Sequence, residues 1–174
     1  TDEKFLSHHR LEDDSYIEEV GLYYEDLALG ETYEHWPRKT FTDEEARVHS
    51  LHCLEWNPQY SDADYINQYL DGKRWINEAF LVGTITALTT RTFGRVVANL
   101  QWKNITLPRA VYAGDTIYAH STLLAKRESK SRPEQGIIEA RTHAFNQQGE
   151  HVCSYERHLL VYKRGRGPYQ KAGY

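Results

Sequence analysis

The chain of 174 residues contains only two cysteines, Cys53 and Cys153, which stand far apart in the sequence. Such a pair provides neither a metal-binding clip nor a disulfide framework, so a reducing environment is indicated. No apolar run approaches the ~20 residues of a membrane-spanning helix, and residues 1–16 lack the apolar stretch of a secretion signal. We therefore expect a cytoplasmic protein without membrane contact.

An excess of basic charge is also lacking. The chain has 21 lysines and arginines against 25 acidic residues, a net charge of -4, and its basic groups are scattered until the tail. A protein of this charge distribution has no broad patch for a nucleic-acid backbone, so no nucleic-acid partner is expected. The length suits one domain. We expect an N-terminal arm at residues 1–20, a folded domain at 21–164 and a flexible basic tail at 165–174, with the arm either ordered against a partner subunit or disordered.

The first half of the chain carries helix signals. Thr42 and Glu45 form a capping box, which predicts a helix to about Leu54. Pro58 ends this region because its ring disfavours helical geometry in the preceding residue. A second short helix is expected at 62–69. The stretch 75–88 is apolar almost all round and predicts a buried central helix.

The second half of the chain carries strand signals. A first strand is expected earlier, at 32–40, and after Gly94 the sequence is rich in β-branched and aromatic residues separated by turn residues. Helices followed by antiparallel strands indicate an α+β layer fold. The four later strands are expected at 96–107, 115–127, 136–146 and 152–163.

Four sequence pieces stand out along these elements: WNP at 56–58, PRAVYAGDT at 108–116, KRESKSRPEQG at 126–136 and NQQGE at 146–150. Together with the order of the elements, they resemble the MaoC-like dehydratase family, whose members adopt the hot dog fold. The resemblance covers roughly residues 21–164 and implies an antiparallel sheet wrapped around a central helix at about residues 76–92. The pieces at 126–136 and 146–150 are most similar to the branch that contains mesaconyl-CoA and itaconyl-CoA hydratases.

The resemblance implies that the turn EWNPQYSD at 55–62 is the reactive centre. Family members keep an aspartate there and a histidine five residues later, which orient water and exchange a proton with the substrate. Here these positions carry Glu55 and Tyr60. Glu55 keeps a carboxylate, whereas a phenol with an ordinary pKa of about 10 cannot cycle protons near neutral pH as imidazole does. We expect Glu55 as base and Tyr60 as hydrogen-bond donor, or else a purely structural turn.

Other candidates follow by position. His49 and His52 share one face of the helix before the turn, so His52 is a candidate substitute for the missing histidine, with a surface or packing role as the alternative. The resemblance places the thioester carbonyl at the first turn of the central helix, where free backbone amides polarise it. That turn is Asn77, Glu78 and Ala79. Glu78 is unexpected beside developing negative charge, and it either faces solvent or acts as a replacement acid or base.

Two further groups are predicted to bind the substrate. Trp56 and Asn57 would contact the acyl part, with core packing and turn capping as their structural alternatives. Arg127, Lys130 and Arg132 would bind the phosphates of CoA or of a phosphopantetheine arm, or else they form a solvated hairpin end. Neither a metal ion nor another cofactor is expected.

The resemblance favours a hydratase or dehydratase acting on an enoyl- or 3-hydroxyacyl-thioester bound to CoA or to a carrier protein. It also implies a homodimer, or a higher oligomer of dimers, with the active site at the subunit interface. Because both dyad residues are substituted, two alternatives remain open. One is an enzyme performing other chemistry on an acyl substrate in a specialised biosynthetic pathway, and the other is a catalytically silent binding or scaffold subunit.

Overall fold

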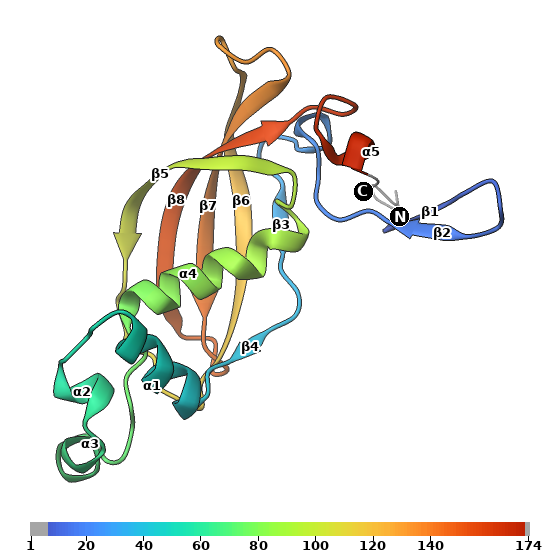
Figure 1. Ribbon diagram of the computed structural model, residues 1–174. Coiled ribbons are helices and arrows are strands. Elements are labelled where there is room, and N and C mark those ends of the chain that lie inside the picture. Colours follow the sequence, from blue (N-terminus) through green and yellow to red (C-terminus); the bar gives the residue numbers. More distant parts are fainter. Residues whose placement is uncertain (1–6, 173–174) are drawn as a thin grey trace.

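The computed structural model describes residues 7–172 and shows a curved antiparallel sheet that wraps around one long helix (Figure 1). The sheet has six strands in the order β3-β6-β7-β8-β5, with β4 also pairing with β6. The predicted hot dog architecture of the α+β class is confirmed. The strands are β3 (Thr32–Glu34), β4 (Lys39–Thr40), β5 (Val96–Thr106), β6 (Thr116–Glu128), β7 (Gln135–Phe145) and β8 (His151–Tyr162).

The four long strands agree with the sequence prediction to within one residue at each end, because turn residues mark their boundaries clearly. The first strand does not. The predicted segment 32–40 is divided into β3 and β4, both of which pair with β6. Pro37 lies between them, and a proline has no N–H to donate to a neighbouring strand.

The central helix is α4 (Glu78–Leu88), continued by one 3-10 turn, η2 (Thr89–Arg91). It is shorter than the predicted 76–92, since Asn77 already caps its first turn. Leu81 and Ile85 are 2% and 0% exposed and lie in the main hydrophobic core. The apolar stretch therefore forms a buried helix, as the sequence predicted.

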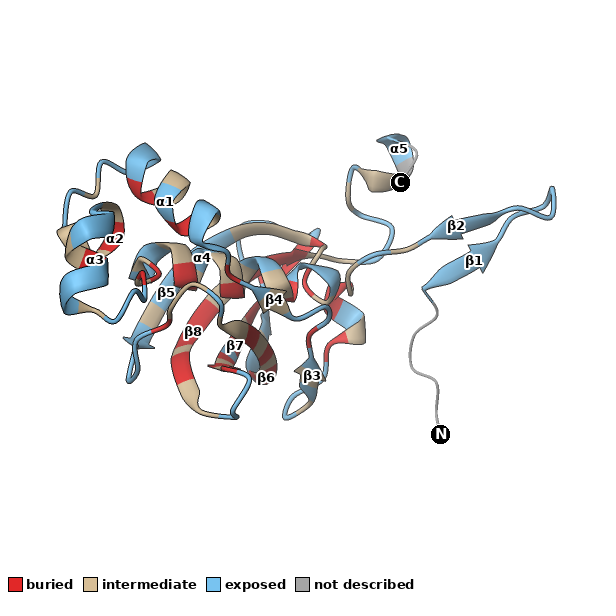
Figure 2. Ribbon diagram, turned by 90° about the horizontal axis from the view of Figure 1, so that it is seen from below, coloured by how far each residue is buried: buried red, intermediate tan, exposed pale blue. Residues whose placement is uncertain are grey.

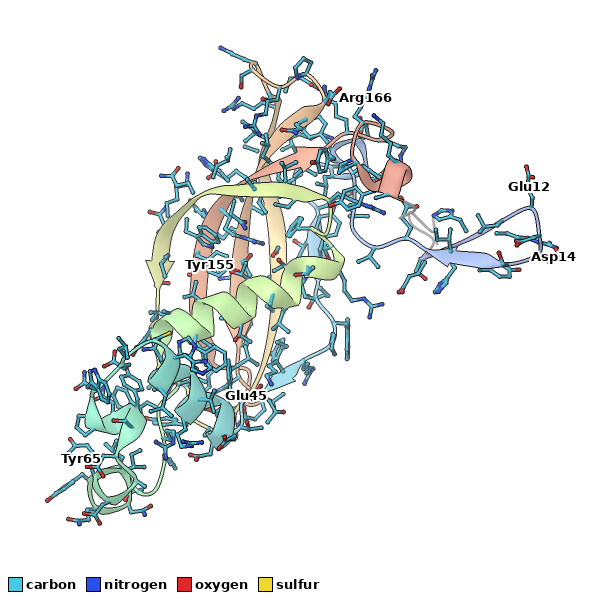
Figure 3. The ribbon with its side chains drawn as sticks, in the orientation of Figure 1. Glu12, Asp14, Glu45, Tyr65, Tyr155 and Arg166 are labelled. Carbon is cyan, nitrogen blue, oxygen red and sulfur yellow. The ribbon has the colours of Figure 1, made fainter. Side chains whose placement is uncertain are left out.

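The inner face of the sheet is shaped to receive this helix. Ala119 of β6 and Ala144 of β7 are fully buried and provide room, while the larger Ile117 and Tyr155 fill the space beside them. Tyr155 projects from the sheet toward α4 (Figure 3), and its hydroxyl lies 3.1 Å from Thr86 Oγ1 of the helix. The core thus combines close packing with a polar contact.

Three further helices lie at the end of the molecule where α4 begins, with α1 beside the helix and α2 and α3 further out (Figure 1). The predicted capping box is present: Thr42 Oγ1 accepts from the amide of Glu45 at 3.1 Å, and Glu45 Oε2 accepts from the amide of Thr42 at 3.0 Å. Within residues 7–172, no helix is long and apolar enough to cross a membrane. The helices are α1 (Asp43–His52), α2 (Pro58–Ser61) and α3 (Ala63–Tyr69).

The N-terminal arm extends away from the domain as a two-stranded hairpin, β1 (His8–Arg10) and β2 (Tyr16–Glu18), with every strand residue exposed (Figure 2). Glu12 and Asp14 lie at its tip (Figure 3). A 3-10 turn, η1 (Tyr24–Asp26), follows the arm. Residues 1–6 and 173–174, which belong to the predicted arm and tail, lie outside the described part.

The sequence suggested a flexible tail at residues 165–174, but part of this segment is folded. Its residues Tyr169–Ala172 form a short helix, α5. The guanidinium of Arg95 lies 4.3 Å from the centre of the Tyr169 ring, and the Tyr169 hydroxyl donates to the carbonyl of Gly94 at 3.3 Å. The aromatic ring attaches the tail, which composition alone did not indicate.

A buried histidine, His35, lies near the segment that follows the C-terminal end of α4. His35 is 4% exposed, and its ring nitrogens lie 2.7 Å from Ser121 Oγ and 3.2 Å from Thr92 Oγ1. Burial, with a smaller contribution from the charge of Arg157, lowers the pKa of His35 to about 4. His35 is therefore neutral in the folded protein at physiological pH.

This pKa predicts an acid-dependent loss of stability. The ordinary pKa of 6.5 applies in the unfolded chain, so between that pH and about 4 the unfolded state binds the proton and the folded state does not. We expect the free energy of unfolding to fall by up to about 3 kcal/mol over this window as the pH is lowered. Urea unfolding at a series of pH values should show this slope in wild type and in the control His52→Gln, but a reduced slope in His35→Gln. Equal slopes in all three would contradict the assignment.

Candidate active site

The turn after α1 begins with the C-terminal cap of that helix. Leu54 adopts a left-handed conformation, with φ of 55°. The amide of Glu55 donates to the carbonyl of Ser50 at 2.9 Å, and that of Leu54 donates to Leu51 at 3.3 Å. This is a Schellman motif, which usually has glycine at the left-handed position. Because leucine occupies this position, the motif could not be read from the residue type, and the helix ends at His52 rather than at the predicted Leu54.

The side chain of Glu55 bonds to the backbone of its own turn. Its Oε1 accepts a hydrogen bond from the amide of Asn57 at 3.0 Å, and the residue is half-buried. Asn57 precedes Pro58, the first residue of α2, without a side-chain cap. Trp56 is 73% exposed and does not pack into the core of this chain. The carboxylate of Glu55 therefore shapes the turn, while Trp56 is presented at the surface.

Tyr60 makes the contact that joins the turn to the central helix. It is 4% exposed, and its hydroxyl donates to Glu78 Oε2 at 2.7 Å. Burial, the hydrogen bond to Glu78 and the nearby charge of Glu55 raise the pKa of Tyr60 to about 12. The phenol is thus a protonated hydrogen-bond donor held against a carboxylate, and the carboxylate that it contacts is that of Glu78 rather than that of Glu55.

The first turn of α4 is less open than the sequence suggested. Asn77 Oδ1 accepts from the amides of Ala79 and Phe80, at 3.0 and 3.3 Å. The amide of Ala79, one of the predicted donors to a substrate carbonyl, is therefore already hydrogen-bonded within the chain. Substrate binding by Asn77 and Ala79 stays a prediction, and the amide of Glu78 is the remaining candidate donor in this turn.

A pocket of about 240 Å³ opens beside this turn. Most of its lining is apolar, and its charged members are Glu78 and Arg109. Arg109 is half exposed, with its Nη2 3.4 Å from Glu150 Oε1. An apolar pocket with a few polar groups is typical of a small-molecule site. The lining residues are Trp75, Ile76, Glu78, Leu81, Leu107, Pro108, Arg109, Ala110 and Val111.

The histidines of α1 do not join the Tyr60–Glu78 pair. His52 is exposed at the last position of the helix. His49 stacks on Phe80, with ring centres 4.4 Å apart, and its Nε2 lies 3.4 Å from Cys53 Sγ. The catalytic role considered for His52 is untested and has no support from this geometry. Within the described part of the chain, no three histidine, cysteine or acidic side chains are grouped so that they could hold a metal ion.

The predicted phosphate-binding residues also lie elsewhere. Arg127, Lys130 and Arg132 are exposed around the β6–β7 hairpin, at the opposite end of the sheet from α1–α3 (Figure 1). Within one chain the fold does not bring them to the turn. Sequence reasoning also missed Arg74, which is buried and hydrogen-bonded to the carbonyl of Tyr60. An isolated arginine before an apolar helix carries no pattern that would have indicated it.

The Tyr60–Glu78 contact predicts how Tyr60 ionises. Between about pH 10 and pH 11 an ordinary tyrosine titrates, whereas Tyr60 should stay protonated. Wild type and Tyr60→Phe should therefore show nearly the same tyrosinate absorbance there. Glu78→Gln removes a neighbouring negative charge but not the burial, so the pKa of Tyr60 should fall part of the way toward its ordinary value, and Glu78→Gln should show more tyrosinate absorbance than Glu78→Gln/Tyr60→Phe. An unchanged difference spectrum would contradict the contact.

Comparison with known proteins agrees with this fold. The profile of the family "Mesaconyl-CoA hydratase" matches residues 2–171. The mesaconyl-CoA hydratase of Cereibacter sphaeroides is 31% identical over 151 residues, which are 83% of this chain and 42% of that protein. The chain thus spans less than half the length of this relative.

Two solved structures show the same architecture. A MaoC-like dehydratase from Rhodospirillum rubrum superposes with a TM-score of 0.70 at 22% identity, over 83% of this chain and 99% of that one. A Mycobacterium tuberculosis protein described as a double hot dog fold gives a TM-score of 0.72 at 19% identity, over 83% of this chain and 45% of that one. At these identities the likeness establishes the fold. The family match over residues 2–171 and the 31% identical relative show that the chain belongs to the mesaconyl-CoA hydratase family.

Proposed function

We propose that the protein hydrates or dehydrates an acyl thioester, with Glu78 and Tyr60 at the reactive centre. The substrate would be an enoyl- or 3-hydroxyacyl-thioester of CoA or of a carrier protein. The observation that carries the proposal is the 2.7 Å hydrogen bond from the Tyr60 hydroxyl to Glu78, beside the pocket at the start of α4. Membership of the mesaconyl-CoA hydratase family supports the substrate class.

Glu78 replaces the base that the sequence assigned to Glu55. In the hydration direction, its carboxylate takes a proton from water as the water oxygen bonds to the β-carbon of the substrate. The electrons of the carbon–carbon double bond move toward the thioester carbonyl, and the enolate so formed takes the proton back from Glu78 at its α-carbon. One water is added in total, and no imidazole is needed. Tyr60 stays protonated and holds Glu78 in place.

The negative charge of Glu78 in the first turn of α4 is compatible with this reaction. Negative charge develops on the carbonyl oxygen only as Glu78 accepts its proton and becomes neutral. The carbonyl would be held by the amide of Glu78 at the positive end of the helix dipole, because Asn77 occupies the next two amides. Glu78 is therefore suited to this position despite its charge in the resting protein.

The reaction is testable by mass spectrometry with a panel of enoyl-CoA thioesters that includes mesaconyl-CoA and itaconyl-CoA. We expect a mass change of one water with wild type. Glu78→Gln should lower kcat/KM at least ~100-fold by removing the base, whereas Glu55→Gln should lower it less than ~10-fold. The exposed Glu44→Gln on α1 is the control. A larger loss for Glu55→Gln than for Glu78→Gln would return the base role to Glu55. No turnover by the folded protein would reject the hydratase proposal and favour the repurposed or silent alternatives.

The proposal includes a homodimer. β5 is the edge strand of the sheet, and Leu100, Trp102 and Ile105 on it are 51%, 39% and 47% exposed. The neighbouring face of α4 exposes small residues, Ala79, Gly83 and Ala87. An apolar edge strand beside a smooth helix face suits a second copy of the chain, which would cover both. The double hot dog relative, about twice as long, supports pairing of two such units.

The dimer predicts a specific sensitivity at Gly83. A Cβ added there has no atom within 4 Å beyond the adjacent backbone of its own helix, and the position is exposed, so Gly83→Leu should fold. It should nevertheless prevent close approach of a second α4. In sedimentation velocity at micromolar concentration, wild type and the surface control Arg47→Leu should be dimers, and Gly83→Leu should be largely monomeric. A monomeric wild type, or a Gly83→Leu dimer as stable as wild type, would contradict this interface.

A further inference from the structure

Arg74 is a buried cation between α3 and α4. Its side chain is 7% exposed, and its donors point to two different helices. Nε donates to Asp43 Oδ1 at 2.7 Å, and Nη1 donates to the main-chain carbonyl of Tyr60 at 2.5 Å. Asp43 begins α1, and Tyr60 lies in α2. One planar guanidinium therefore fixes both elements relative to each other.

The main chain around Arg74 is fixed as well. The carbonyl of Arg74 accepts from the amide of Ala113 at 2.9 Å, and the amide of Ile76 donates to the carbonyl of Val111 at 2.8 Å. These bonds attach the segment before α4 to the loop that also lines the pocket. This segment leads into α4, whose first residue is Glu78. The position of Arg74 is thus coupled to the helix that carries the reactive carboxylate.

Tyr60 needs such support because its own helix is short. α2 has four residues, and a single helical turn does not hold its geometry without external contacts. Arg74 supplies a contact to the backbone of Tyr60 itself, opposite the hydroxyl that meets Glu78. The planar fork of arginine holds both acceptors in a fixed geometry through two different nitrogens, which the single nitrogen of a lysine does not reproduce.

We propose that Arg74 is a positioning residue of the reactive pair: it fixes the backbone of Tyr60 so that the phenol stays against Glu78. This inference rests on the proposed function for its effect on catalysis. Its structural part, the placement of the Tyr60 phenol, is independent of any activity. The alternative is that Arg74 contributes only to overall stability.

The test combines Arg74→Lys, which replaces the planar guanidinium fork by a single ammonium group, with Tyr60→Phe. The control is Arg47→Lys on α1, where the arginine pairs with exposed Glu44. Between about pH 10 and pH 11, Arg74→Lys should show one additional tyrosinate relative to Arg74→Lys/Tyr60→Phe, because a displaced phenol regains solvent and leaves Glu78. The control should not. All measurements are made where urea unfolding shows each variant to be folded.

In the turnover assay, Arg74→Lys should lower kcat about 10-fold or more and change KM less than about 3-fold. In the Tyr60→Phe background it should have almost no further effect, because Arg74 acts through Tyr60. Additive effects, or an unchanged Tyr60 ionisation in a folded Arg74→Lys variant, would overturn the proposal. If no thioester is turned over, the hydratase proposal fails while the ionisation measurement still decides the placement role of Arg74.

Discussion

The structure depends on the burial of one apolar helix against the concave face of the sheet. Leu81 and Ile85 of α4 enter a core in which alanines of β6 and β7 leave room for the helix. Burial of this surface is the main favourable term that holds helix and sheet together. It also determines where the N-terminus of α4 lies. Every group in the candidate site is placed relative to that end, so the packing of α4 is a condition for the chemistry as well as for the fold.

The same core accommodates polar groups that a purely hydrophobic interior would exclude. His35, Ser121 and Thr142 form a chain of hydrogen bonds on the inner face, and Tyr155 bonds to Thr86 on α4. Arg157 is 2% exposed and donates to Thr89 at the C-terminal end of the helix, where the helix dipole favours a cation. Buried polar groups are tolerated when they are bonded in this way. They fix the register of the helix on the sheet, at the cost of sensitivity to acid through His35.

Substitution of the familiar aspartate and histidine is accompanied by a rearrangement rather than by a simple exchange. Glu55 is drawn into the turn by the amide of Asn57, and Tyr60 turns toward α4 and meets Glu78. The carboxylate and the donor therefore come from two elements that the sequence separates by 18 residues. Arg74 connects the backbone of one to the segment that precedes the other. The hydration that we propose for these groups uses a single carboxylate and needs no imidazole.

The sequence by itself determined the order and type of the elements. Capping residues mark α1, apolar residues mark α4, and Gly and Pro separate the long strands, because each of these signals acts over a few neighbouring residues. It also located the turn at Glu55 and Tyr60 through resemblance to a family. Only the tertiary structure decided which carboxylate Tyr60 contacts, that Asn77 occupies the amide of Ala79, and that Arg74 bonds to the carbonyl of Tyr60. These outcomes depend on side-chain directions and on contacts between distant segments, which arise only when α4 packs on the sheet and brings α2 against its first turn.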